Sequence, residues 1–293
     1  MNGFEDDFVP KGSTFSGKRK RARSLMLNVA NQLLGTNLED DTLIIGTSGR
    51  YEFKNKGIDV FLESLNRLNR DKNLHKNVVA FINVPGWVGE PREDLQERLK
   101  SKKKFDTPLE VPFITHWLHN MTHDQVLDML KYLGMGNRPE DKVKVIFVPC
   151  YLDGRDGIMN KDYYDILIGQ DLSVYASYYE PWGYTPLESV AFRVPTITTD
   201  LAGFGLWVNS LKNQHGLSDG VEVLHRSDYN YSEVADGIRD TITLFAEKSE
   251  KEVKDIRKRA GEVAERALWK HFIQYYYEAY DIALRNASKR LLS

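Results

Sequence analysis

The sequence has a single cysteine, and this scarcity excludes several kinds of site. Cys150 has no intrachain partner, so the chain has no intrachain disulfide, no CxxC motif and no zinc site built from cysteines. No apolar run approaches the roughly 18–20 residues of a membrane-spanning helix, and the first residues are acidic where a signal peptide would be basic and then apolar. These absences predict a cytoplasmic protein without a membrane partner.

The chain also lacks an excess of charge of either sign. Its 40 Lys and Arg residues against 42 Asp and Glu residues leave a net charge of −2 over 293 residues. This balance excludes a globally basic nucleic-acid-binding protein, and 41% hydrophobic residues exclude bulk disorder. A basic run at 18–21, followed by Arg23, could bind a polyanion, but we interpret it as the solvated face of a helix.

Short apolar runs alternate with helical stretches along the chain. The predicted strands are 42–47, 78–84, 143–149, 172–176, 194–198 and 220–224, and the predicted helices are about 18–34, 57–70, 121–133, 160–169, 186–192, 231–247 and 250–288. Strands that are nearly all apolar and separated by helices belong to right-handed crossovers in a parallel sheet. The sequence therefore predicts an α/β fold with a Rossmann-like, doubly wound parallel sheet. The stretch 85–141 is too long for one crossover, and we expect extra helices there.

Ligands of open parallel sheets bind beyond the carboxyl ends of the strands, so the residues after each strand are candidates for a site. After the first strand, Arg50 and Lys56 lie six residues apart on a glycine-bounded loop. A guanidinium grips phosphate oxygens bidentately and a nearby ammonium adds a point charge, which together suit a diphosphate. The alternative is that both are solvated side chains of a polar loop.

The stretch after the fourth strand has the form of a helix start. We expect Thr185 as N-cap, Pro186 at the first helical position and Glu188 three residues past the cap. The free N–H groups of such an end bind anions, and Gly183 lacks the Cβ that would keep a phosphate away. On this evidence alone Glu188 could be a capping-box partner and Glu180 a loop carboxylate.

Three histidines, His116, His119 and His123, have spacings at which a continuous helix could present them to a metal. A helix-cap pattern at 120–122 interrupts such a helix. We therefore interpret them as ordinary surface or core histidines and predict no metal site.

Two stretches of the sequence carry a resemblance to a known family. They are Gly49-Arg50-Tyr51-Glu52-Phe53-Lys54-Asn55-Lys56-Gly57 and Ser177-Tyr178-Tyr179-Glu180-Pro181-Trp182-Gly183-Tyr184-Thr185-Pro186-Leu187-Glu188. They resemble the two signature stretches of the animal and fungal type of glycogen synthase, which also has bacterial members. The resemblance covers most of 42–207, with a weaker similarity around Trp269. It implies the GT-B architecture, in which two Rossmann-like domains face each other and the second holds a nucleotide-sugar donor. The chain resembles only that second domain, with 1–41 as hinge and leading helix, 42–248 as sheet core and 249–293 as C-terminal helix. The N-terminal GT-B domain, on this polypeptide or a partner chain, is thus an expected partner.

The resemblance also implies a role for each matching residue. Arg50 and Lys56 would bind the donor diphosphate, where charge develops during transfer. Glu180 would lie beside the transferred glucose, as a nucleophile or, as we expect, as electrostatic support. Glu188 would hold the ribose hydroxyls.

Further roles concern the phosphates and the base. The backbone of Gly183, Tyr184 and Thr185 would cradle the phosphates. Tyr163 falls where the family stacks a ring on the uracil, although its neighbour Tyr164 could be the ring that points inward. The expected activity is retaining transfer of glucose from UDP-glucose to the non-reducing end of glycogen or another α-1,4-glucan, without a metal or other cofactor. ADP-glucose as donor stays an alternative.

Two functions compete with this expectation. The chain could be a stand-alone nucleotide-sugar-binding or regulatory module without transferase activity of its own. A nicotinamide oxidoreductase is disfavoured because no G-x-G-x-x-G opens the first helix.

The late helix carries two further features. The basic residues Arg257, Lys258, Arg259 and Arg266 match only part of the arginine cluster that binds glucose 6-phosphate in eukaryotic relatives. The rings Phe272, Tyr275, Tyr276, Tyr277 and Tyr280 exceed what a single helix face needs. We expect some of these rings to be exposed and to favour a homo-oligomer or another partner.

Overall fold

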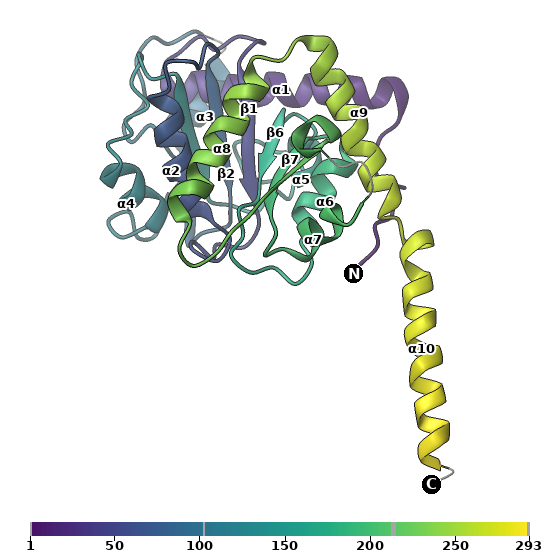
Figure 1. Ribbon diagram of the computed structural model, residues 1–293. Helices are drawn as coiled ribbons and strands as arrows, with labels where there is room; N and C mark the ends of the chain where they lie inside the picture. Colours follow the sequence, from purple (N-terminus) through teal and green to yellow (C-terminus); the bar gives the residue numbers. More distant parts are fainter. Residues whose placement is uncertain (1, 102, 212–214, 292–293) are drawn as a thin grey trace.

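Six short apolar runs of the chain pair as neighbouring strands of one parallel sheet (Figure 1). The computed structural model describes residues 2–101, 103–211 and 215–291. The strand order is β5-β2-β1-β6-β7-β8, and every neighbouring pair is parallel. The strands are β1 (Leu43–Ser48), β2 (Val78–Asn83), β5 (Val143–Val148), β6 (Leu172–Val174), β7 (Thr196–Thr199) and β8 (Val221–Leu224). Each predicted strand overlaps an observed one, so the α/β prediction is confirmed.

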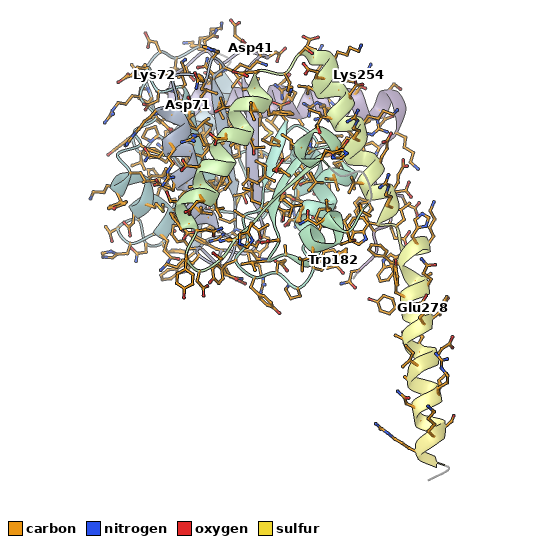
Figure 2. The ribbon with its side chains drawn as sticks, in the orientation of Figure 1. Asp41, Asp71, Lys72, Trp182, Lys254 and Glu278 are labelled. Carbon is orange, nitrogen blue, oxygen red and sulfur yellow. The ribbon has the colours of Figure 1, made fainter. Side chains whose placement is uncertain are left out.

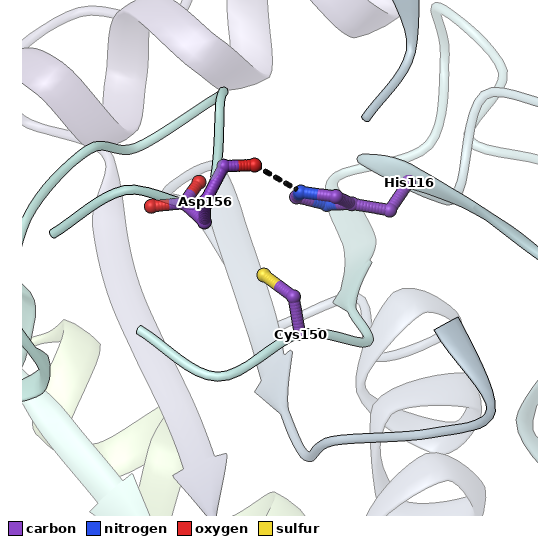
Figure 3. Close-up of side chains that lie close together, drawn as sticks. All are labelled: His116, Cys150 and Asp156. Carbon is purple, nitrogen blue, oxygen red and sulfur yellow. Dashed lines mark hydrogen bonds between the residues drawn. The ribbon is translucent and has the colours of Figure 1, made fainter. Parts of the chain in front are cut away.

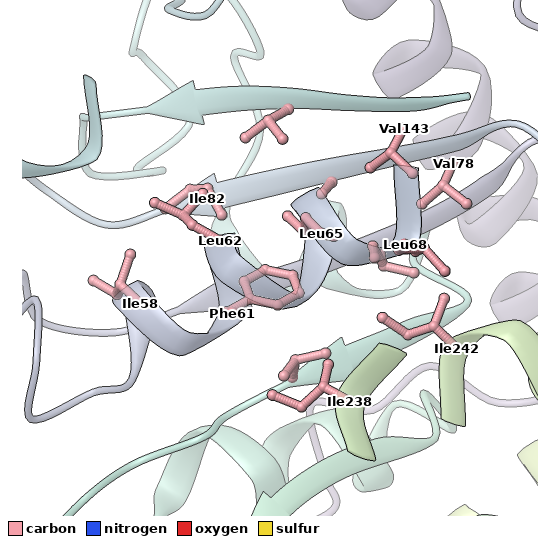
Figure 4. Packing of buried hydrophobic residues seen from close by; sticks show 14 of the residues in the cluster. Ile58, Phe61, Leu62, Leu65, Leu68, Val78, Ile82, Val143, Ile238 and Ile242 are labelled. Atoms are coloured by element: carbon pink, nitrogen blue, oxygen red, sulfur yellow. The ribbon is translucent and has the colours of Figure 1, made fainter. Parts of the chain in front are cut away.

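Helices cover both faces of the sheet, as a doubly wound fold requires. On one face α2 (Ile58–Asn69) and α8 (Tyr231–Ala246) pack in one apolar cluster with the strand side chains, and Phe61 and Leu65 of α2 are fully buried (Figure 4). On the other face α1 (Gly12–Leu34) packs against the alternate strand side chains. The remaining helices of the sheet core are α5 (Tyr163–Leu167), α6 (Tyr184–Ala191), α7 (Gly203–Asn209) and the short 3-10 helix Gly216–Asp219.

The stretch 85–141 holds the expected extra helices and an unexpected hairpin. Its helices are α3 (Glu93–Ser101) and α4 (Gln125–Tyr132). Between them, β3 (Val88–Pro91) and β4 (His116–Leu118) form a small antiparallel pair. Because His116 lies in a strand, no helix joins it to the later histidines.

The prediction of one helix over 250–288 is wrong. The structure has two helices, α9 (Glu250–Arg266) and α10 (Trp269–Leu291). The N-terminal segment enters the break: Phe4 N–H donates to the Ala267 carbonyl at 2.9 Å, and Trp269 N–H donates to the Phe4 carbonyl at 3.1 Å. These bonds replace the helical ones. Only glycine fits at position 3, because a Cβ there would lie 2.6 Å from Trp269.

Beyond its first turns α10 projects from the rest of the molecule, and Glu278 lies on the projecting part (Figure 2). Phe272 is buried at its base, whereas Tyr275, Tyr277 and Tyr280 are exposed. The expectation that some of these rings are exposed is confirmed. In the described part of the chain, none of the helices combines the length and the apolar character needed to cross a membrane.

The basic run on α1 is only partly a solvated face, which corrects the sequence-based interpretation. Arg19 and Arg23 each bond the carboxylate of Asp171 at 2.5 Å, and all three side chains are largely buried. Burial alone would raise the pKa of Asp171, but the two guanidinium groups lower it below its ordinary value. The ion-paired residues anchor α1 beside β1, because Asp171 also accepts from the Ile44 N–H at 2.9 Å.

Candidate functional site

A cavity of about 290 Å³ opens at the carboxyl edge of the sheet, where three neighbouring strands end. Its walls come from the segments that follow β1, β2 and β5 and from the starts of α5 and α6. The lining residues are Ser48, Gly49, Arg50, Asn83, Pro85, Cys150, Tyr151, Leu152, Tyr163 and Thr185. The cavity therefore lies where ligands of open parallel sheets bind.

The two predicted basic residues occupy different environments. Arg50 lines the cavity with a side chain that is 75% exposed, and its Nη1 lies 2.8 Å from Glu52 Oε1. Lys56 is 16% exposed, and its Nζ pairs with Oε2 of Glu180, which is 21% exposed. The structure thus brings together Lys56 and Glu180, a contact that spacing did not predict. Arg50 is thus an exposed guanidinium that lines the cavity, whereas Lys56 and Glu180 form a largely desolvated ion pair outside its lining residues. Both cations can bind an anion.

Backbone bonds hold the loop that carries Glu180. Its N–H donates to the Leu201 carbonyl at 3.3 Å, and its carbonyl accepts from the Gly203 N–H at 3.0 Å. A Cβ on Gly203 would lie 2.3 Å from the Pro181 carbonyl oxygen, so this close approach requires glycine. The neighbouring Trp182 is buried edge-on against Phe272, with ring centroids 5.6 Å apart. The loop is therefore fixed to both α7 and the base of α10.

The helix start that follows differs from the prediction. Helix α6 begins at Tyr184, and its N-cap is Gly183 with φ 105°, not Thr185. Glycine is the N-cap because it adopts positive φ without the steric cost that a threonine side chain would have. Thr185 instead lines the cavity, and Pro186 lies within the first turn, where it needs no N–H partner. The N-terminus of α6 is thus at the cavity, as predicted.

Glu188 is not a capping-box partner. Its Oε1 accepts from the hydroxyl of Tyr164 at 2.8 Å. Burial raises the pKa of Glu188, and the hydrogen bond from Tyr164 lowers it only in part. A largely desolvated carboxylate with lone pairs to spare can accept hydroxyl groups of a ligand.

The structure separates the two candidate rings. Tyr163 lines the cavity, and its hydroxyl lies 2.7 Å from Ser48 Oγ. Tyr164 stacks on Phe192, with ring centroids 5.0 Å apart and planes 2° from parallel. Tyr163 is therefore the ring available for stacking on a ligand.

Sequence reasoning missed Asn83, the last residue of β2, and Cys150, which follows β5. Both line the cavity with Tyr163. Both lie at the carboxyl ends of strands, where ligands of open parallel sheets bind, so the same rule could have selected them. Their position beside β1 depends on the strand order, which no local pattern contains.

His116, Cys150 and Asp156 form a compact group, with the possible ligand atoms within 4.8 Å of one another (Figure 3). His116 Nε2 lies 2.7 Å from the Asp156 carbonyl oxygen, which can only accept, so Nε2 carries the proton. Nδ1 then accepts from Thr115 Oγ1 at 2.9 Å. The Asp156 carboxylate accepts from three backbone N–H groups, those of residues 158, 159 and 160. Because the ligand atoms of His116 and Asp156 are already engaged, we interpret their hydrogen bonds as contacts that hold the loop after β5 in place.

A second cavity, of about 570 Å³, lies between α1 and α9 and is strongly basic. Arg257 and Lys258 line it together with Arg19 and Arg193. Arg259 instead bonds Asp219 at 2.9 Å. The structure therefore gathers two of the four basic residues noted on the late helix.

The chain is similar to known proteins over most of its length. A family model described as glycogen synthase matches residues 34–107 and 90–291. The glycogen [starch] synthase of Neurospora crassa is 29% identical over 304 residues, and the liver enzyme of Mus musculus is 30% identical over 301 residues. Each alignment covers 85% of this chain but 42% of the relative, so the chain spans less than half the length of these proteins.

Solved structures show the same fold at low sequence identity. Anabaena Alr3699/HepE in complex with UDP-glucose is 17% identical with a TM-score of 0.52, covering 96% of this chain and 56% of that one. The N-terminal domain of Candida albicans trehalose-6-phosphate phosphatase is 12% identical with a TM-score of 0.53, covering 94% of this chain and 47% of that one. These structures show that the fold is that of a GT-B domain. The family match shows that the chain belongs to the glycogen synthase family.

Proposed function

We propose that this chain is the donor-binding part of a glycosyltransferase that transfers glucose from UDP-glucose to the non-reducing end of an α-1,4-glucan. The observation that carries the proposal is the Lys56–Glu180 pair, which joins the loops that follow β1 and β6 at the edge of the sheet where the cavity opens. Membership of the glycogen synthase family supports the reaction class.

In the proposed mechanism, positive groups stabilise the departing diphosphate. Arg50 contributes an exposed guanidinium, Lys56 contributes a less exposed ammonium, and the first turn of α6 offers backbone N–H groups to the phosphates. These groups can stabilise the negative charge of the diphosphate as a divalent cation would, so we propose transfer without a metal or other cofactor. Transfer that is insensitive to EDTA would support this.

The other residues orient the donor. Tyr163 stacks on the base, and Glu188 accepts the ribose hydroxyls with the oxygen lone pairs that Tyr164 leaves free. Glu180, held against Lys56, supports the positive charge that develops at the anomeric carbon. The configuration at that carbon is retained.

We also propose that the acceptor is positioned by an N-terminal GT-B domain, on the same polypeptide or a partner chain. Positioning an acceptor in a closed cleft accounts for about 7–11 kcal/mol of a barrier. The exposed rings of α10 support a contact with that domain or with a second copy of this chain. A cytoplasmic location agrees with a single, buried cysteine.

Calorimetric titration of this chain with UDP, with ADP as a comparison, tests the donor site. Tighter binding of UDP than of ADP is expected, and no binding of UDP would contradict the proposal. Release of UDP from UDP-glucose in the presence of glycogen tests the second point. This chain alone should release little, and robust glucan-dependent release would show that it needs no further domain. UDP binding without transfer, even with the N-terminal domain added, would favour a binding or regulatory module.

A further inference from the structure

The side-chain amide of Asn83 is buried at the end of β2 with both polar atoms unpaired. Asn83 is 5% exposed, and within the part of the chain that the structure describes neither Oδ1 nor Nδ2 has a hydrogen-bond partner. Buried amides are almost always paired, because an unpaired donor or acceptor has lost its bonds to water without compensation. The folded chain therefore supplies no partner for these atoms, and because both are also closed to solvent, a ligand in the cavity reaches them only when the side chain turns toward it.

The place of Asn83 shows where that partner would lie. In the sheet it is level with Ser48 of β1 and Val148 of β5, so it occupies the middle of the three strand ends that surround the cavity. The strand positions that share its side, Val79 and Phe81, pack in an apolar cluster. Asn83 is the polar end of an otherwise apolar row, and it lines the same cavity as Tyr163.

A carboxamide offers one acceptor next to a pair of donors. Such a group pairs bidentately with the edge of a nucleobase, which also presents a donor beside an acceptor. On uracil these are the N3–H and the adjacent carbonyl oxygen. We propose that Asn83 recognises the base of the donor: Oδ1 accepts from uracil N3–H, and Nδ2 donates to the adjacent carbonyl oxygen. The inference rests on the proposed function, because it takes the occupant to be a uridine nucleotide.

A base-recognition role and a structural role predict opposite effects on stability. Leucine has nearly the shape of asparagine and no polar atoms to leave unpaired. Asn83→Leu should therefore unfold at the same temperature as the wild type or higher, in the absence of ligand. It should bind UDP about tenfold more weakly or worse, because two hydrogen bonds to the base are lost.

Asn137→Leu is the matched control. Asn137 is also buried, but its Nδ2 donates to the Pro112 and Val145 carbonyls at 2.7 and 2.8 Å, and its Oδ1 accepts from the Val145 N–H at 2.8 Å. This variant loses these bonds and places leucine at a backbone φ of 50°, so it should melt at a lower temperature and, while folded, bind UDP as the wild type does. A third variant, Asn83→Asp, keeps the acceptor but loses the donor, so it should weaken UDP more than ADP, whose exocyclic amine can donate to a carboxylate.

Two analogues identify the part of the nucleotide that Asn83 contacts. N3-methyl-UDP should bind the wild type about tenfold more weakly than UDP, and this difference should shrink in Asn83→Leu. The 2′-deoxy analogue should lose the same factor in both proteins, since the ribose contact is assigned to Glu188.

The outcomes separate this inference from the proposed function. If the wild type does not bind UDP, both fail. If the wild type binds UDP and Asn83→Leu binds it equally well, or melts lower with unchanged affinity, Asn83 is a structural residue and only the inference is overturned. An equal loss of N3-methyl-UDP affinity in both proteins would likewise overturn the assignment to the base.

Discussion

Replacing Lys56 by alanine removes the less exposed of the two cations assigned to the proposed diphosphate site. Its side chain is 16% exposed and pairs with Glu180, which is 21% exposed, so both charges are largely desolvated. A charge-assisted hydrogen bond to phosphate contributes about 1.5–3 kcal/mol, which corresponds to a loss of roughly ten- to 150-fold in UDP affinity. The unpaired Glu180 carboxylate would then face an anionic ligand, which places the expected loss near the upper end. Calorimetric titration with UDP measures it.

The same argument predicts that the double variant Lys56→Ala/Glu180→Gln binds UDP better than Lys56→Ala alone, because the opposing carboxylate is gone. Lys54→Ala, an exposed lysine on the same loop, is the control and should change UDP affinity by no more than about twofold. Thermal melting of each variant confirms that it is folded. Wild-type affinity in Lys56→Ala would refute the reasoning, and so would a double variant that binds no better than the single one.

Three further predictions concern buried groups. Asp171→Ala leaves Arg19 and Arg23 without their shared carboxylate, so urea denaturation should show that the free energy of unfolding falls by about 3–5 kcal/mol. The control Asp165→Ala, at a more exposed ion pair, should lower it by at most about 1 kcal/mol. Equal losses in the two variants would contradict this. The raised pKa of Glu188 means that the folded protein binds this proton more tightly than the unfolded chain, so stability falls as pH rises above the ordinary glutamate range. Glu188→Gln should therefore be more stable than the wild type at pH 7 but bind UDP more weakly, and an unchanged pH dependence of unfolding would be the adverse result. Burial raises the pKa of Cys150 to about 12, so a disulfide reagent at pH 8 should label this thiol only after denaturation; rapid labelling of the native protein would show that the thiol is accessible and ionised.

Much of the fold could be predicted because its signals are local. The strands are short apolar runs whose side chains are buried on both faces, as in β1, β2 and β5. The break between α9 and α10 could not be predicted, because bonds to Phe4, at the other end of the chain, create it. The start of α6 was misplaced because the threonine and proline pattern outweighed the glycine whose positive φ sets the N-cap.

In the candidate site, too, individual residues could be predicted from the sequence, whereas their contacts could not. Arg50, Lys56, Glu180 and Glu188 could be selected because they follow strands in stretches that resemble a known family. Their partners could not: the Lys56–Glu180 pair depends on β1 and β6 being neighbours in the sheet. Asn83 was missed for the same reason, since its place beside β1 and β5 follows from the strand order.

A crystal structure of this chain with UDP tests the central claim most directly. We predict that the diphosphate lies between the Arg50 and Lys56 side chains and the first turn of α6, with the base stacked on Tyr163. UDP bound elsewhere, or bound in the cavity without contact to either basic residue, would contradict the account.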